Sequence, residues 1–442
     1  MSESDCSGSM SIYRLLSGHK TLVILIISAI IMMVMLVIYH SIGDGSETDV
    51  FNFYKQAEAI KAGQLPYKDF VFEFPPFALI FFMIPSIFTS DLQTYIFLFG
   101  IEIVFFSLVT LYFMINVAEK MKINKYFVSI IFMAFILIYF QQMIRKFDII
   151  VAAFTFISLY LFCEKKYTSG YAVMAFAALV KVYPAFLIPI FIIMNLTDKE
   201  DVMRKKNVLK GIVACLGVAL VAIVPFILMS VPISDILSFI GFHSNRGFQI
   251  ESIVALIVQC LGSLGLTTFV IVPSCDTYDV YSSICNALLP YWSAITLLAI
   301  VLVLVLIMHH ASNVKCRSNY RVFTSEIIMY SLAVIMTFML VNKVFSTQYV
   351  IWIYALITFL AVINEKKINM PIAVLSILIV VFSGLIVYFG QYYDLFLIVN
   401  IIRDLMLLFV FSQIILHLLG KKNIFDPSYS EALPELRIKE TK

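Results

Sequence analysis

The chain has 442 residues, of which 62% are hydrophobic and only 13% are charged, and its formal net charge is +3. Soluble domains carry about 25% charged residues, whereas apolar runs of the roughly 20 residues that one membrane helix needs recur here between residues 21 and 419. This composition excludes a soluble protein and predicts an all-α polytopic membrane protein. The lysines and arginines cluster in loops, where they report membrane topology and are no nucleic-acid footprint.

The first 20 residues are polar and end in basic residues, and an apolar run follows directly. A cleaved signal peptide has a shorter apolar core and small residues at its cleavage site. We therefore expect an uncleaved first helix with the N-terminus in the cytoplasm. About twelve crossings follow from the apolar runs, at residues 21–40, 76–90, 92–117, 126–141, 146–163, 170–194, 210–230, 289–310, 324–341, 349–363, 370–389 and 395–419.

This map places three basic loops after residue 197, together with the tail from Lys421, on the cytoplasmic side, as the positive-inside rule requires. The loops "EKMKINK" (119–125) and "EKK" (164–166) fall outside despite their lysines. A hairpin within 170–194 that breaks at Pro184 would invert this part of the map. Residues 118–170 are therefore the part of the predicted topology that the rule fits least.

Two outer segments are long, 41–75 and 231–288. In the first, "VFNFYKQAEAIKAG" has apolar residues at helical spacing and a glycine stop, which predicts an amphipathic helix lying on the membrane. In the second, the short apolar stretch before Gly262 predicts another helix in the interface. We expect one transmembrane domain over residues 1–420 and a short cytoplasmic tail over 421–442.

Carboxylates near the membrane boundary are costly and suggest function. Asp49 follows the first helix closely and could act as a general base, although a helix N-cap is the more common role by about two to one. Glu73 precedes Pro75 and Pro76, where it either favours the start of a helix or points into a cleft. Glu58 and Asp69 are expected to be solvated.

Several cations also lie at predicted helix ends. Lys181 stands in an apolar run that Pro184 breaks, so it either reaches an interface or binds an anion. The segment "FHSNRGFQIES" contributes His243 and Arg246 beside Gln249 and Glu251, and arginine suits phosphate. Further along, "LVNKVFSTQYVIW" supplies Lys343 and Gln348, although Tyr349 and Trp352 there are also typical of the aromatic belt.

Two remaining patterns concern Arg145 with Asp148 and the seven cysteines. Arg145 and Asp148 are spaced to pair on one helix face. The cysteines show no metal-ligand spacing, and the pair His309–His310 beside Cys316 fits a cytoplasmic loop better than a zinc site. Cys275 and Cys285 would form a disulfide if they face an oxidising exterior, and two free thiols are equally compatible with the sequence. We expect neither a metal nor a cofactor.

Four stretches in chain order resemble the GT-C membrane glycosyltransferases, in particular glycosyltransferase family 87, which uses polyprenyl-phosphate mannose. They are "TDVFNFYKQAEAIKAGQLPYKDFVFEFPP", "ALVKVYPAFLIP", "HSNRGFQIES" and "NKVFSTQYVIW". The resemblance covers residues 44 to about 360 and implies a GT-C-like bundle of about twelve transmembrane helices with juxtamembrane helices in the first outer loop. The region of Arg145 and Asp148 departs from the Gly-Gln-x-Asn pattern of some family 87 relatives.

By this resemblance, Asp49 would be the general base and Glu73 a second catalytic candidate in an inverting transfer. The donor would be a polyprenyl-phosphate sugar, and the acceptor a hydroxyl of a lipid or glycan. Stabilisation of the leaving phosphate would be the largest catalytic contribution. The residues expected to bind the donor phosphate or substrate are Lys181, Arg246, Lys343, His243, Gln348 and Tyr67.

The leading hypothesis is thus a hexosyltransferase, with its active site facing outward from the cell membrane, and the family resemblance implies mannose as the sugar. A transporter or flippase of lipid-linked sugars would use the same cleft without bond chemistry. A third reading is a structural subunit of an envelope-assembly complex. Besides the lipid-linked sugar and the acceptor, we expect membrane lipids as partners and no nucleic acid.

Overall fold

The computed structural model describes residues 3–42, 49–241, 246–274, 277–314, 317–362, 369–421 and 423–424, with side chains from residue 19 onward. Cys275, Cys316 and His243 lie outside these residues, so the predictions that rest on them are not addressed. The first half of the chain contains α1 (Glu3–Ile42), α2 (Asp49–Lys61), α3 (Ala78–Phe88), α4 (Leu92–Met121), α5 (Lys125–Ile138), α6 (Phe140–Met143), α7 (Asp148–Cys163), α8 (Tyr167–Ala178), the 3₁₀ helix η1 (Tyr183–Leu187), α9 (Ile188–Thr197) and α10 (Arg204–Leu228).

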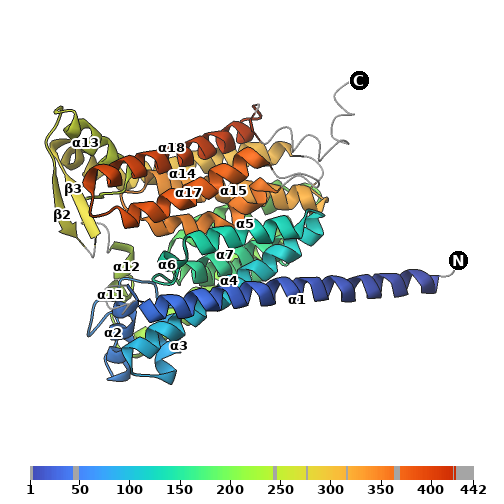
Figure 1. Ribbon diagram of the computed structural model, residues 1–442. Coiled ribbons are helices and arrows are strands. Elements are labelled where there is room, and N and C mark those ends of the chain that lie inside the picture. The colour runs from blue at the N-terminus through green and yellow to red at the C-terminus, as the bar shows by residue number, and fades with distance from the viewer. Residues whose placement is uncertain are drawn as a thin grey trace.

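The second half combines short elements with long helices. Its elements are α11 (Ile233–Ile236), α12 (Ser238–Gly241), β1 (Phe248–Gln249), α13 (Ile253–Ser263), β2 (Val270–Ser274), β3 (Thr277–Tyr281), α14 (Ser283–Asn313), α15 (Tyr320–Val341), the 3₁₀ helix η2 (Thr347–Ile353), α16 (Tyr354–Ala361), α17 (Met370–Tyr388) and α18 (Tyr393–Leu418). Helices account for most of the described chain and form one elongated bundle (Figure 1).

Seven of the described helices are long and apolar enough to cross a membrane. This confirms a helical, polytopic membrane protein, while the predicted count of twelve crossings is not confirmed. The other predicted crossings correspond to apolar helices of 10–17 residues. The seven long helices are α1 from His19 onward, α4, α10, α14, α15, α17 and α18.

Contacts between loops define one end of the bundle, which we call the basic end because its loops are rich in lysine and arginine. Lys125 donates to Thr21 at the start of the apolar part of α1, with 3.2 Å between Nζ and Oγ1. Lys120, at the end of α4, forms a salt bridge with Glu164 after α7. The start of α15 joins them, since the Lys120 ammonium lies 5.9 Å from the ring centroid of Tyr320, the first residue of that helix.

The opposite end, which we call the site end, holds α2, α3 and the three strands (Figure 1). There α2 and α3 pack together through a stack of Phe53 on Phe82, with ring centroids 4.0 Å apart. Lys61 at the end of α2 donates to the Ser86 carbonyl of α3 and to the Ser90 hydroxyl. The predicted crossing at 76–90 is therefore an 11-residue helix held beside α2.

Residues 167–197 form a helical hairpin. The start of α8 and the end of α9 lie side by side, because Asn195 donates to the Tyr171 hydroxyl at 3.4 Å. Both belong to the basic end, where Arg317 donates to the Thr197 hydroxyl at 2.8 Å. Lys181 stands at the tip, and Pro184 occupies the first turn of η1, where proline needs no backbone partner.

The short α3 and the hairpin together explain why two basic loops did not fit the predicted topology. With neither segment traversing the bundle, residues 119–125 and 164–166 lie at the same end as residues 198–203 and the start of the apolar part of α1. All of these loops carry lysine or arginine. The described structure thus gathers basic loops at one end, the arrangement that the positive-inside rule favours.

A three-stranded antiparallel sheet in the order β1-β3-β2 was not predicted. Phe248 of β1 pairs with Val280, and Val272 of β2 pairs with Asp279. Valine and tyrosine favour strands, but each strand has at most five residues, so pairing between distant segments decides their structure. The helix predicted before Gly262 is present as α13, which packs on β1 and on α18, while its predicted place in the membrane interface stays a prediction.

Gly211 lets α8 and α10 approach closely. A Cβ at this position would lie 2.3–2.6 Å from ring atoms of Tyr171, which is fully buried. By contrast, a Cβ at Gly217, two turns further along α10, would meet no atom within 4 Å. The close contact depends on the absence of a side chain at Gly211.

We therefore predict that Gly211→Ala lowers the midpoint of thermal unfolding in detergent, because overpacking costs about 1–3 kcal/mol. Gly217→Ala is the matched control in the same helix, and it should be neutral or slightly stabilising because alanine favours helix. Equal midpoints for the two variants would show that the α8–α10 contact is not tight.

Candidate functional site

The site is organised by residues 342–353, the irregular segment and 3₁₀ helix between α15 and α16. Residues 246–282 hold the three strands and α13, and we call them the strand lobe. The backbone of residues 342–353 joins this lobe, because Lys343 O accepts a hydrogen bond from Gln249 N at 2.9 Å. Their side chains reach three buried ionic contacts, one between helices and two that involve the strand lobe. The break between α15 and α16 places polar groups where a continuous apolar helix would carry none.

The first group centres on Asp148, whose side chain is 1% exposed. Its Oδ1 accepts from Lys181 Nζ and from Trp352 Nε1, both at 2.6 Å. The Lys181 ammonium also lies 4.8 Å from the ring centroid of Phe147. A buried carboxylate is costly unless it is paired and hydrogen-bonded, and here the hairpin tip and η2 each supply one of the two contacts to the carboxylate at the start of α7.

Aromatic rings enclose this ion pair. Trp352 stacks on Tyr183 and on Tyr349, with ring centroids 4.1 and 3.9 Å apart. Because Tyr183 belongs to η1, the stack joins the two irregular segments of the fold. The hairpin break that the sequence places near Pro184 therefore positions both a cation and an aromatic ring.

The second group centres on Arg246 and Asp279, an ion pair of 3.0 Å that is almost fully buried. Asp279 also accepts from Gly247 N at 3.0 Å. Lys343 Nζ donates to the Arg246 carbonyl at 2.9 Å. Burial lowers the pKa of Lys343, with Asp279 opposing that effect and Arg246 adding to it.

A third ionic contact joins Glu251 to α18. Arg403, which is fully buried, donates to a Glu251 carboxylate oxygen at 3.4 Å and to Asp404 at 2.8 Å. Its guanidinium also lies 4.4 Å from the ring centroid of Phe345. Burial raises the pKa of Glu251 to about 7, although the Arg403 charge acts in the opposite direction.

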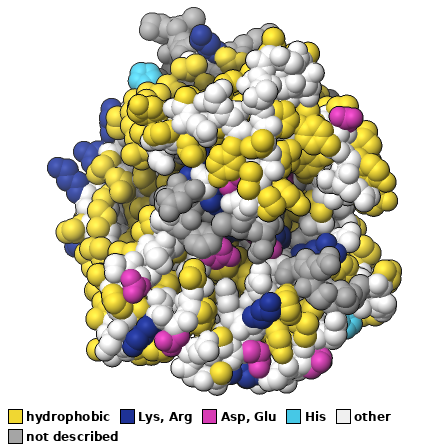
Figure 2. Space-filling view, turned by 90° about the vertical axis from the view of Figure 1, so that its left-hand side faces the viewer, with side chains coloured by type: hydrophobic (Ala, Val, Ile, Leu, Met, Phe, Trp, Pro, Cys, Tyr) yellow, Lys and Arg dark blue, Asp and Glu magenta, His cyan; other side chains and the backbone are white. Residues whose placement is uncertain are grey.

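Tyr349 lies beside the first group. Its ring stacks on Trp352, and the Lys181 ammonium lies 5.8 Å from its ring centroid. The assignment of Glu73, Lys181 and Arg246 to one substrate site stays a prediction. Seen from the site end, lysine, arginine, aspartate and glutamate side chains appear near the centre of the face among hydrophobic and other side chains, and further charged side chains lie along its lower part (Figure 2).

Three other predicted residues, Asp49, Gln348 and Tyr67, take no part in the ion pairs above. Asp49, the first residue of α2, forms an ion pair with Lys146 at 2.5 Å. Gln348 is half-buried within η2. Tyr67 is buried with its backbone in the left-handed region, at φ 68°, and donates its hydroxyl to the Phe74 carbonyl at 2.7 Å. Burial raises the pKa of Tyr67, so its hydroxyl remains a donor.

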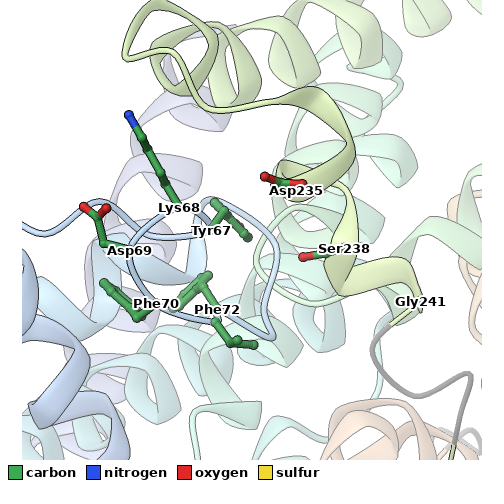
Figure 3. Close-up of a pocket in the computed structure, with 9 residues that line it drawn as sticks. Tyr67, Lys68, Asp69, Phe70, Phe72, Asp235, Ser238 and Gly241 are labelled. Atoms are coloured by element: carbon green, nitrogen blue, oxygen red, sulfur yellow. The ribbon is translucent and has the colours of Figure 1, made fainter.

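A pocket of about 610 Å³ opens beside this loop, between residues 67–72 and the short helices α11 and α12. Tyr67 and Phe72 form its apolar side. Asp235 and Ser238 point toward the loop from the opposite side (Figure 3). An apolar wall with a few polar groups is typical of a small binding site.

The predicted pair of Arg145 with Asp148 is replaced by other partners. Arg145 Nε donates to the Tyr39 hydroxyl of α1 at 2.7 Å, while Asp148 is held by Lys181 and Trp352. Cys285 is buried at the start of α14.

Sequence reasoning missed Asp279, Arg403 and Asp404. Arg403 and Asp404 lie within the apolar run of the last predicted crossing, and charges inside such a run are a signal of function or of pairing. Asp279 gave no comparable signal in the sequence, because polar and apolar residues alternate irregularly around it. Its burial depends on the pairing of β3 with β1 and β2.

A family model described as GPI transamidase subunit PIG-U matches residues 22–250 of this chain. The matched range extends from α1 to β1 and includes Asp49, Glu73, Asp148, Lys181 and Arg246. No curated protein matches the chain.

This match corrects the functional prediction. The chain is not a polyprenyl-phosphate-sugar-dependent hexosyltransferase or mannosyltransferase, because the family that matches is one of GPI transamidase subunits. It is therefore neither a glycosyltransferase nor a mannosyltransferase. The resemblance to family 87 is not confirmed, and the transporter alternative has no support. The short stretches that carried the resemblance have structural roles here, such as the hairpin break at Pro184 and the turn at Tyr67.

We predict that Asp148→Asn lowers the free energy of unfolding by about 3 kcal/mol, because it leaves Lys181 without its buried counter-ion. This is the lower end of the usual range for breaking a buried pair, since Lys181 keeps some access to water. Thermal unfolding in detergent measures the effect. Asp49→Asn is the matched control, since a half-exposed pair contributes about 1 kcal/mol or less. The double variant Asp148→Asn/Lys181→Gln should lose less than the sum of the single losses.

A pH dependence follows from Glu251. Its pKa is raised from 4.5 to about 7 in the folded state, so between these values the folded chain binds more protons than the unfolded chain. Its contribution to the free energy of unfolding therefore falls as the pH rises from about 4.5 to about 7. Thermal midpoints measured across this range should fall more steeply for the wild type than for Glu251→Gln, and parallel curves would contradict the assignment.

Proposed function

The chain belongs to the PIG-U family, and from this premise we propose that it is a non-catalytic, multi-pass membrane subunit of a GPI transamidase complex. The observation that carries the proposal is the family match over residues 22–250, which covers the chain from α1 to β1. Under this proposal the chain acts with protein partners, and the transfer chemistry belongs to another subunit.

The pairing of charges at the site end supports a structural role. Lys181, Arg246 and Arg403 each have a carboxylate partner within the chain. Removing one member of such a pair leaves a buried charge uncompensated. These residues are therefore suited to fixing the positions of the helices and the strand lobe relative to one another.

The loop over residues 67–72, with α11 and α12, is the part of the site end that we propose faces the reaction partners. Its pocket is open and combines apolar and polar walls. The rigid arrangement beneath it, from α2 and α3 to the hairpin tip, would hold this surface at a fixed height relative to the membrane.

The test uses a secreted reporter protein with a C-terminal anchor signal, which consists of small residues, a polar spacer and a hydrophobic tail. In cells that lack the chain, the reporter should keep its tail and receive no lipid anchor, while the unused precursor glycolipid accumulates. Re-expression of the wild-type chain should restore most of the anchoring. Accumulated precursor separates loss of the transamidase from loss of an enzyme that makes the glycolipid.

Two variants sharpen this test. Asp49→Asn should restore anchoring as well as the wild type does, because a non-catalytic subunit needs no base at this position. Gly217→Ala, in an uncrowded position of α10, controls for expression. Normal anchoring in cells without the chain, or disappearance of the precursor glycolipid, would refute the proposed function.

A further inference from the structure

Three side chains that could bind a metal ion converge at the basic end of the bundle, far from the site described above. They are His310 in the last turn of α14, Glu326 near the start of α15 and His417 in the last turn of α18. These helices pack against one another (Figure 1). One potential ligand atom from each residue lies within 4.8 Å of the other two.

From this geometry we propose that His310, Glu326 and His417 bind a divalent transition-metal ion such as Zn²⁺. Two imidazoles and one carboxylate form a donor set that zinc uses in proteins, with bonds of about 2.0–2.2 Å. Ligand atoms around a tetrahedral ion at such bond lengths are about 3.3–3.6 Å apart. Glu326 Oε2 lies 3.3 Å from His310 Nδ1, and the other carboxylate oxygen, Oε1, lies 3.8 Å from His417 Nε2. One ligand atom from each residue lies within 4.8 Å of the other two, so the three side chains would move closer together to complete the site.

The surroundings of the three residues favour a cation. Glu326 is 2% exposed, and a buried carboxylate is stabilised by pairing or by coordination of a metal. Both histidines are at helix C-termini, where the helix dipole adds partial negative charge. His310 is 17% exposed, which gives an ion access to the cluster from the basic end.

Tyr330 completes the local arrangement. Its hydroxyl lies 2.8 Å from His310 Nδ1, so binding the ion through this nitrogen replaces that hydrogen bond. Tyr330 then stands beside the ion as part of the buried wall of the site. The sequence gave no hint of this set, because its members are 16 and 91 residues apart along the chain, and the spacing rules for metal sites concern nearby ligands.

His309 provides a matched control. It precedes His310 in α14, about 100° away around the helix, and it is exposed. A surface histidine that binds zinc without a built site would behave like His309. A residue of the proposed site would behave differently from its neighbour.

The experiment uses the full chain, purified in detergent without a polyhistidine tag, stripped with a chelator, incubated with Zn²⁺ alone and desalted. Elemental analysis should find about one zinc per chain in the wild type and in His309→Gln. The ratio should fall at least tenfold in His310→Gln and in His417→Gln. Retention of zinc by His417→Gln, or equal loss in His309→Gln, would overturn the proposal.

A second measurement needs no variant and so does not depend on their folding. The wild-type chain loaded with Co²⁺ should show the intense visible absorption of a tetrahedral ion bound by nitrogen and oxygen, and Zn²⁺ should abolish it. Zinc should also raise the midpoint of thermal unfolding, because an ion that binds only the folded state stabilises it. Absence of stoichiometric zinc in the wild type would refute the site outright.

Discussion

The buried carboxylate of Asp148 constrains the whole site end. In a largely apolar bundle this charge needs both a counter-ion and hydrogen-bond donors. Lys181 reaches it only because α8 and α9 form a hairpin with an irregular tip. Trp352 reaches it only because a 3₁₀ segment interrupts the path from α15 to α16. Two departures from regular helix thus meet at one carboxylate.

The hairpin, together with the short α3, also sets the course of the chain. A hairpin at 167–197 returns to the end from which it starts, and the short α3 stays with α2. Together they bring the loops after α4 and α7 to the basic end. The lysines of these loops fit the positive-inside rule when two of the predicted crossings are replaced by the short α3 and the hairpin.

The functional correction has a physical basis in the same features. An acid at a helix start, a proline restart and a lysine beside a helix break all have structural uses in a membrane bundle. Three of the four stretches that resembled a glycosyltransferase contain at least one of them. In this structure Lys181 and Arg246 are held by Asp148 and Asp279, and family membership instead assigns the chain to the GPI transamidase subunits.

The sequence by itself determined the helical membrane class, the helix after α1, the short helix α13 and the break near Pro184. These follow from composition, periodicity and proline chemistry, which act over a few turns of chain. It also singled out Lys181, Arg246 and Glu73. Only the tertiary structure decided their partners, the three-stranded sheet, the hairpin course of α8 and α9, and the meeting of His310 with Glu326 and His417. Such contacts join residues tens to hundreds of positions apart, and their energies depend on burial that exists only in the folded bundle.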